Sequence, residues 1–157
     1  MRDSRVTVFN TTTVDSTTAV DGPSINLLDG RVGTTLYGTS LYGLGVEVIL
    51  KNVRGPGART LDVWWQRSQD GTTWEDFIHV GRFQIDSSGQ LLKEDGSTPL
   101  GLDRAKLSTR LVTAMGKYAR LRLVPSGTWD SVGPNDAVVD AYISDGTLPY
   151  ADTGKIL

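Results

Sequence analysis

The sequence predicts an all-β protein, an antiparallel β-sandwich of jelly-roll-like type, on three observations. About seven to nine short segments alternate between apolar and polar residues or are rich in β-branched residues, as strands are. Gly, Asp and Pro separate these segments at intervals of about 8 to 12 residues, which is typical of all-β folds. No long segment has a helical period, and the weak helix candidate that begins at Leu102 would make one or two turns.

The first 24 residues differ from the rest because they contain little that a core could bury. A β-like run at residues 6–9 precedes a tract of Thr, Ser and Asp. We expect residues 1–24 to form an extended N-terminal arm or an edge strand, which a partner could order. Residues 25–148 would form the sandwich, and residues 149–157 a C-terminal tail.

The strands of the sandwich follow a weak apolar piece at residues 25–28 and a Gly-rich stretch at residues 33–45. They are predicted at residues 46–53, 59–66, 74–83, 107–115, 117–124 and 137–143. A long polar excursion with its own Asp-Gly turn separates the third of these strands from the fourth. Gly116 would join the fourth and fifth as a hairpin.

The stretch "RSQDGTTWEDF", residues 67–77, predicts a hairpin between the second and third strands. Asp70 and Gly71 tolerate positive φ, so they fit the two central positions of a type I′ turn. The resulting register would place Trp65 and Trp74 on the apolar face of the hairpin.

The same register brings three pairs of side chains together across the hairpin. They are Arg67 with Trp74, Asp62 with His79, and Trp64 with Phe77. The last pair lies on the otherwise polar face, where aromatic side chains require a cover or a partner. We therefore select Trp64 and Phe77 as candidate interface residues.

No residues have the spacing of a catalytic or metal site. His79 is the single histidine, and no Ser, Thr or second carboxylate is placed to complete a relay with it. The chain has no Cys, which removes thiolate zinc sites and cysteine nucleophiles. Asp/Gly turns such as residues 86–89 lack the ligand order of a calcium loop. We predict a protein that is not an enzyme and has neither metal nor cofactor.

Charge and hydropathy argue against nucleic acid and membrane partners. The formal net charge is -2, whereas proteins that bind nucleic acid usually carry a large basic excess on one face. No run approaches the roughly 18 apolar residues of a membrane span, and the first residues lack the apolar core of a signal peptide. In the strand at 117–124, Arg120 and Arg122 share one face, which adds two candidate interface residues.

A carbohydrate-binding or adhesin module is the alternative that the tryptophans suggest. Sugar-binding sandwiches place planar aromatic rings under the faces of pyranose rings. Trp65 and Trp74 are expected at the core, which leaves Trp64 and Trp129 for a sugar or for a protein interface, where Trp is enriched.

The order of features over residues 36–143 resembles a group of small β-sandwich proteins of tailed bacteriophages, the capsid decoration or cement proteins. The motifs that carry the resemblance are Ser68-x-Asp70-Gly71-x-x-Trp74, Lys117-Tyr118-x-Arg120 and Ser126-Gly127-Thr128. The resemblance implies a non-enzymatic virion protein on the exterior of the capsid, made in the host cytoplasm. It implies adhesion across joints between copies of the major capsid protein, and a homodimer or homotrimer whose repeated contacts supply avidity.

Overall fold

The computed structural model describes residues 6–26, 44–111 and 117–144, and these residues form nine β-strands and no helix. The strands are β1 (Val6–Val14), β2 (Val20–Asp21), β3 (Ile25–Asn26), β4 (Leu44–Arg54), β5 (Arg59–Ser68), β6 (Glu75–Ile85), β7 (Ala105–Leu111), β8 (Tyr118–Gly127) and β9 (Asp136–Ser144).

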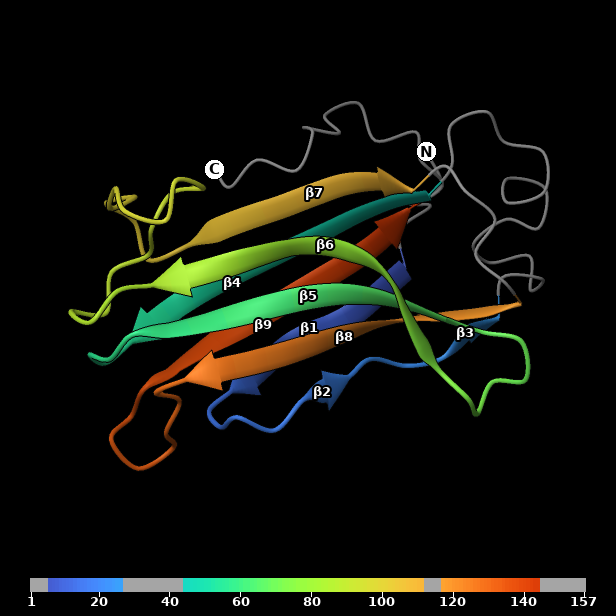
Figure 1. Cartoon of the computed structure of the whole chain (residues 1–157), viewed down its shortest axis with the longest axis horizontal. Coiled ribbons are helices and arrows are strands. Elements are labelled where there is room, and N and C mark those ends of the chain that lie inside the picture. Colours follow the sequence, from blue (N-terminus) through green and yellow to red (C-terminus); the bar gives the residue numbers. More distant parts are fainter. Residues whose placement is uncertain (1–5, 27–43, 112–116, 145–157) are drawn as a thin grey trace.

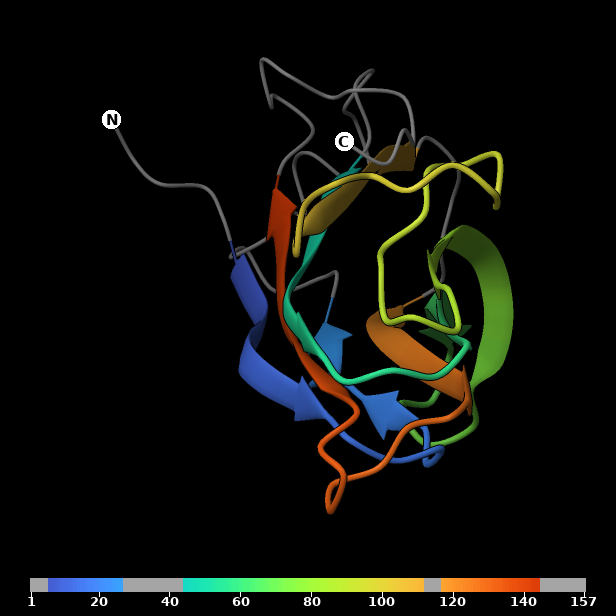
Figure 2. The ribbon, with the colours of Figure 1, turned by 90° about the vertical axis from the view of Figure 1, so that its left-hand side faces the viewer.

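The strands form two antiparallel sheets, which Figure 2 shows as separate layers. One sheet has the order β1-β9-β4-β7 and the other the order β2-β8-β5-β6, with β3 also paired to β8 (Figure 1). With β2 and β3 counted as one strand, every connection but that from β5 to β6 crosses between the sheets. This is the strand order of a jelly roll, and the predicted fold class is confirmed.

Alternation along the strands decides which face each sheet turns inward. In β5, Leu61, Val63 and Trp65 are fully buried, and the intervening Asp62 and Trp64 are only partly buried. The same alternation in β8 buries Ala119, Leu121 and Leu123. The inward and outward positions predicted for these two strands are therefore confirmed.

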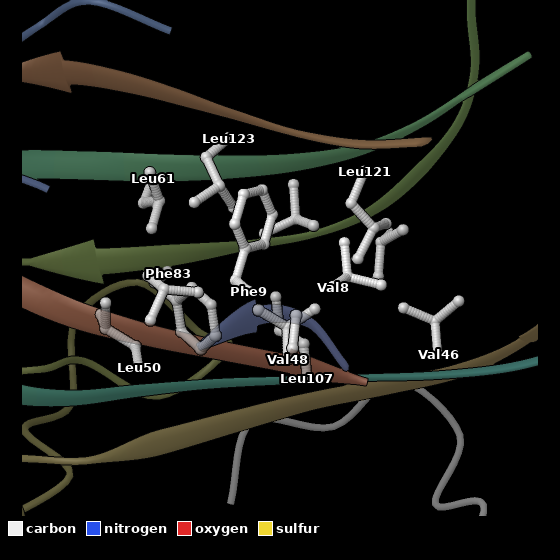
Figure 3. Packing of buried hydrophobic residues seen from close by; sticks show 14 of the residues in the cluster. Val8, Phe9, Val46, Val48, Leu50, Leu61, Phe83, Leu107, Leu121 and Leu123 are labelled. Atoms are coloured by element: carbon white, nitrogen blue, oxygen red, sulfur yellow. The ribbon is translucent and has the colours of Figure 1, made fainter. Parts of the chain in front are cut away.

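The core lies between the two sheets and is aliphatic with a few aromatic rings (Figure 3). One sheet supplies Leu61, Leu121 and Leu123, and the other supplies Phe9, Val46, Val48, Leu50 and Leu107. Burying each such side chain contributes about 1.5–3 kcal/mol, which makes this layer the main source of stability.

Two glycines allow the sheets to approach each other at the two sides of the sandwich. A Cβ at Gly22 would lie 2.8 Å from Cγ1 of Val8 in β1, and a Cβ at Gly81 would lie 2.8 Å from Cδ2 of Leu107 in β7. Any larger residue would therefore push the edge strands apart at these two seams.

The N-terminal segment is built into both sheets wherever the structure describes it. Residues 6–14 pair with β9 and residues 20–21 pair with β8. Val8, Phe9 and Val14 lie in the core. In the described part of this segment, β1 and β2 each lie at one edge of their sheet.

Two expectations for the second half of the chain are wrong. The segment after Leu102 does not form a helix, because Ala105 already begins β7. The strands predicted at 107–115 and 117–124 do not form a hairpin, because β7 pairs with β4 and β8 pairs with β5 in the opposite sheet. Gly116 itself lies outside the described residues, as do most of the Gly-rich stretch and the tail at 149–157.

Candidate functional site

The β5–β6 connection is a six-residue loop that is organised by the carboxylate of Asp70. Oδ1 of Asp70 accepts the backbone N–H groups of Thr72 (2.8 Å) and Thr73 (2.7 Å) and the hydroxyl of Ser68 (2.9 Å). Gly71, with φ of 78°, donates its N–H to the Ser68 hydroxyl. These hydrogen bonds to the charged form lower the pKa of Asp70, with the Thr73 N–H as the largest cause.

The predicted two-residue type I′ turn is therefore wrong, and the register across the hairpin differs from the one it implied. Arg67 pairs with Glu75 rather than with Trp74. Further along, β6 carries two extra residues, Phe77 and Val80, each of which has no counterpart on β5. Each bulge shifts the pairing by one residue, and no turn signal in the sequence encodes it.

The shifted register separates two of the predicted pairs. Trp64 lies opposite His79, with ring centroids 4.7 Å apart and ring planes tilted by 46°, so the Trp64–Phe77 pair does not form. Phe77 packs against the core edge, where the Arg67 guanidinium lies 3.9 Å from the centre of its ring. The predicted stacking of Arg67 on Trp74 is thus replaced by stacking on Phe77.

Asp62 is the centre of an ion-pair cluster beside Trp64. His79 Nε2 lies 2.7 Å from Asp62 Oδ1, so the predicted side-chain contact forms although His79 lies opposite Trp64 rather than opposite Asp62. Arg82, the cross-strand neighbour of Asp62, donates to both carboxylate oxygens at 2.8 and 3.0 Å. The carboxylate is therefore contacted by Arg82 and His79, and its side chain is 13% exposed.

Trp74 lies in the β5–β6 loop and contacts β8. The Arg120 guanidinium lies 4.4 Å from the centre of its ring, and Arg120 Nε donates to Gln66 Oε1 at 2.7 Å. Gln66 in turn donates to Asp76 at 2.8 Å. Trp74 is half-buried and outside the core cluster, which corrects its predicted inward position.

Arg122 is the neighbour of Trp64 on the other side, since the two residues pair between β5 and β8. Among the described residues its ionic partner is Asp21, at 3.6 Å, which is too long for a hydrogen bond. Arg120 lies closer to the same carboxylate, at 3.2 Å.

The side chains around Trp64 form one continuous surface on the outer face of the β2-β8-β5-β6 sheet, which we call the aromatic–arginine face. Its members are Trp64, Trp74, His79, Arg82, Arg120 and Arg122. They come from β5, β6, β8 and the β5–β6 loop, so hydrogen-bonded strands hold them at fixed spacing.

Trp129 does not belong to this face, which corrects its prediction as an exposed residue. It is 7% exposed, and its Nε1 donates to the backbone oxygens of Thr60 and Ser126 at 3.1 and 3.2 Å. Its ring lies 5.0 Å from the guanidinium of Arg59, which is 2% exposed. Of the two tryptophans that the carbohydrate-binding alternative required, Trp64 is therefore accessible to a sugar and Trp129 is not.

Arg59 stabilises the β4–β5 loop at one end of the sandwich. Its guanidinium donates to the backbone oxygens of Arg54, Gly55 and Gly57 at 2.7 to 3.1 Å. The sequence did not single out this residue, since a charged residue at the start of a strand is usually exposed.

Acidic and histidine side chains are spread over the described part of the chain. Within residues 6–26, 44–111 and 117–144, no three His, Asp or Glu side chains group closely enough to hold a metal ion. A hollow of about 330 Å³ beside the β5–β6 loop is lined by residues of the loop and its flanking strands. Of its two carboxylates, Asp70 accepts loop hydrogen bonds and Glu75 accepts a hydrogen bond from Arg67 Nε at 2.7 Å. No helix in the described part of the chain is long and apolar enough to span a membrane.

Sequence reasoning selected five of the residues that the structure brings to this face, without placing the two arginines beside the hairpin, and it missed three. It selected Trp64, His79, Asp62, Arg120 and Arg122, which the structure brings to one sheet face. It missed Arg82, Gln66 and Asp21, the partners of Asp62 and of the two arginines. The alternation of inward and outward residues in β5 could have placed Gln66 on the same face as Trp64. The position of Arg82 opposite Asp62 depends on the two bulges in β6.

No protein-family model and no curated protein sequence matches the chain. Among solved structures, the chain is similar to that in the crystal structure of an infectious bursal disease virus VP2 subviral particle, with 13% sequence identity and a TM-score of 0.43. The match covers 97% of this chain and 37% of the VP2 chain.

Proposed function

We propose that this protein is a non-enzymatic structural component of a virion, a cement or decoration protein that adheres to the exterior of a capsid. Its partner would be the major capsid protein, and the protein would stabilise the shell by spanning joints between subunits. The sequence resemblance to phage decoration proteins supports this proposal, as does the jelly-roll architecture, which occurs in viral capsid domains.

The observation that carries the proposal is the aromatic–arginine face. Trp and Arg are the residue types most enriched at the energetic centres of protein interfaces. Here Trp64 lies between Arg122 and His79 on a middle strand of the sheet, and both flanking residues are fixed by strand pairing. Because strand pairing fixes the backbone at these positions, adhesion would lose little backbone conformational entropy.

The structure away from this face also fits a protein that binds a capsid surface without changing its shape. The buried Arg59–Trp129 pair ties the β4–β5 loop to the β8–β9 connection, so that end of the sandwich resists distortion. A shell presents many equivalent sites, so modest affinity at each site suffices when a decoration protein is itself oligomeric.

The test is cosedimentation of the purified protein with assembled capsids that lack it. Trp64→Ala should reduce the bound fraction at least tenfold, which corresponds to a loss of about 1.4 kcal/mol per site or more. The matched control is Leu102→Ala, because Leu102 is an exposed apolar residue, 59% exposed, in the connection between β6 and β7.

Leu102→Ala should bind as the unmodified protein does, and both variants should unfold at similar urea concentrations. If the unmodified protein fails to sediment with the capsids, the capsid function is wrong. If both variants bind equally well, the capsid contact lies elsewhere on the molecule.

A further inference from the structure

We propose that the partner surface that meets the aromatic–arginine face is acidic, with carboxylates on both sides of an apolar group that packs on Trp64. This inference rests on the proposed function and specifies the chemistry of the shell surface. It follows from which hydrogen-bonding groups of the face are already used and which are not.

The carboxylates near Trp64 are used within the protein. Asp62 accepts hydrogen bonds from Arg82 on both oxygens and contacts His79, and its side chain is 13% exposed. Asp76 accepts from Gln66 on one oxygen. Asp21, whose side chain is 38% exposed, contacts Arg120 at 3.2 Å and Arg122 at 3.6 Å. Each of the three carboxylates therefore has a partner within the protein before another molecule arrives.

The donors on the face are not used to the same extent. Arg122 has an ionic contact to Asp21 at 3.6 Å and makes no side-chain hydrogen bond to the described residues, and its side chain is 35% exposed. Arg82 is 50% exposed and uses Nε and Nη2 on Asp62, which leaves Nη1. Unused guanidinium donors beside an indole fit a partner that supplies carboxylate oxygens.

The spacing of these donors defines a pattern for the partner. Arg122 on β8 pairs with Trp64 on β5, and Arg82 on β6 pairs with Asp62, two residues before Trp64 on the same strand. Neighbouring strands are about 4.8 Å apart and residues two apart in a strand are about 6.6 Å apart, so the two arginine positions are separated by roughly 12 Å. Two acidic side chains at about that separation, with an apolar residue between them, would complement the row.

A second copy of this chain fits the same face poorly. A two-fold contact places a surface patch against itself, so the unused arginine donors of one copy would face those of the other. Like charges in such a contact are repulsive, and the carboxylates of Asp62, Asp76 and Asp21, which could relieve the repulsion, already contact donors of their own chain.

The test measures binding to assembled capsids for the unmodified protein and for Arg122→Glu, Arg122→Lys and Lys93→Glu at two salt concentrations. Lys93→Glu is the matched control, because it makes the same change of charge at an exposed position in the β6–β7 connection. Thermal unfolding of each variant checks that the fold is retained.

We expect Arg122→Glu to weaken binding at least tenfold and to reduce the salt dependence of binding. Arg122→Lys should keep most of the affinity, and Lys93→Glu should bind as the unmodified protein does. Equal binding by Arg122→Glu, combined with loss in Trp64→Ala, would overturn the acidic-partner inference and leave the capsid function standing. Failure of the unmodified protein to bind would overturn both.

Nucleic acid is the other anionic partner that could accept hydrogen bonds from these arginines. Competition with DNA in the same capsid-binding measurement tests it. A random-sequence DNA duplex of 20 base pairs, added in excess, should leave capsid binding unchanged. Release of the protein from the capsids, together with retention of the duplex, would assign Arg122 to nucleic acid and overturn the inference.

Discussion

At the scale of single residues, the same type of Asp-Gly turn occurs at two places in the chain. Asp70-Gly71-Thr72-Thr73 and Asp95-Gly96-Ser97-Thr98 have the same hydrogen bonds, from two backbone N–H groups to Oδ1 and from a Thr hydroxyl to Oδ2. The sequence shows both Asp-Gly pairs, but the pair alone does not distinguish a tight hairpin turn from this longer capped loop. The Thr three residues after each Asp is the signal that could have made the distinction.

The two turns predict a loss of stability in acid. Hydrogen bonds to the charged form lower the pKa of Asp95 to about 2, with the Thr98 hydroxyl as the largest cause, and they lower the pKa of Asp70 as well. A carboxylate in the unfolded chain has a pKa of about 3.9. The folded protein therefore gains stability from these groups above pH 4 and loses it as the pH falls towards 2.

Urea unfolding at a series of pH values checks this acid sensitivity. The double variant Asp70→Ala, Asp95→Ala should be less stable at neutral pH and should lose less stability between pH 4 and pH 2 than the unmodified protein. An unchanged loss over that range in the double variant would show that other carboxylates cause the acid sensitivity.

Trp129 provides a second prediction for a single residue. Because it is buried against Arg59, Trp129→Ala should lower the free energy of unfolding by about 3–5 kcal/mol, the range for large aromatic side chains in cores. Trp64→Ala, on the outer face, should cost markedly less. Equal and small losses in urea unfolding for the two variants would contradict the assigned burial of Trp129.

At the scale of elements, alternation was sufficient to assign the faces of β5 and β8 but not their partners. Leu61, Val63 and Trp65 point inward as their period of two requires. The register of β6 could not be predicted, since Phe77 and Val80 are extra residues whose bulges no turn signal in the sequence marks. The missing hairpin between β7 and β8 has a similar cause, because proximity in sequence does not reveal which sheet a strand joins.

The seam between β6 and β7 gives a prediction at this scale. A Cβ at Gly81 would overlap both methyl groups of Leu107, which is 2% exposed and has little room to move. Gly81→Ala should therefore reduce the free energy of unfolding by about 1–3 kcal/mol. Thermal or urea unfolding measures the change.

Gly133→Ala is the matched control for the seam. Its added Cβ would lie 3.6 Å from Asp130 Oδ2, an ordinary contact, and stability should change by less than about 0.5 kcal/mol. Equal effects of the two substitutions would show that the β6–β7 seam is not tightly packed.

At the scale of the whole molecule, the fold favours adhesion through a sheet face over strand addition at the edges of the β2-β8-β5-β6 sheet. β6 has two bulges, and β2 and β3 are two residues each. Bulged and very short edge strands resist pairing with another chain. The broad face between these edges holds Trp64, Arg120 and Arg122 in hydrogen-bonded strands.

The most direct measurement of the central claim is a cryo-electron microscopy reconstruction of capsids saturated with this protein. The proposed function predicts that the β2-β8-β5-β6 sheet faces the shell, with Trp64 at the centre of the contact and acidic shell residues near Arg122. Attachment through the β1-β9-β4-β7 sheet, with the aromatic–arginine face turned to solvent, would contradict the account.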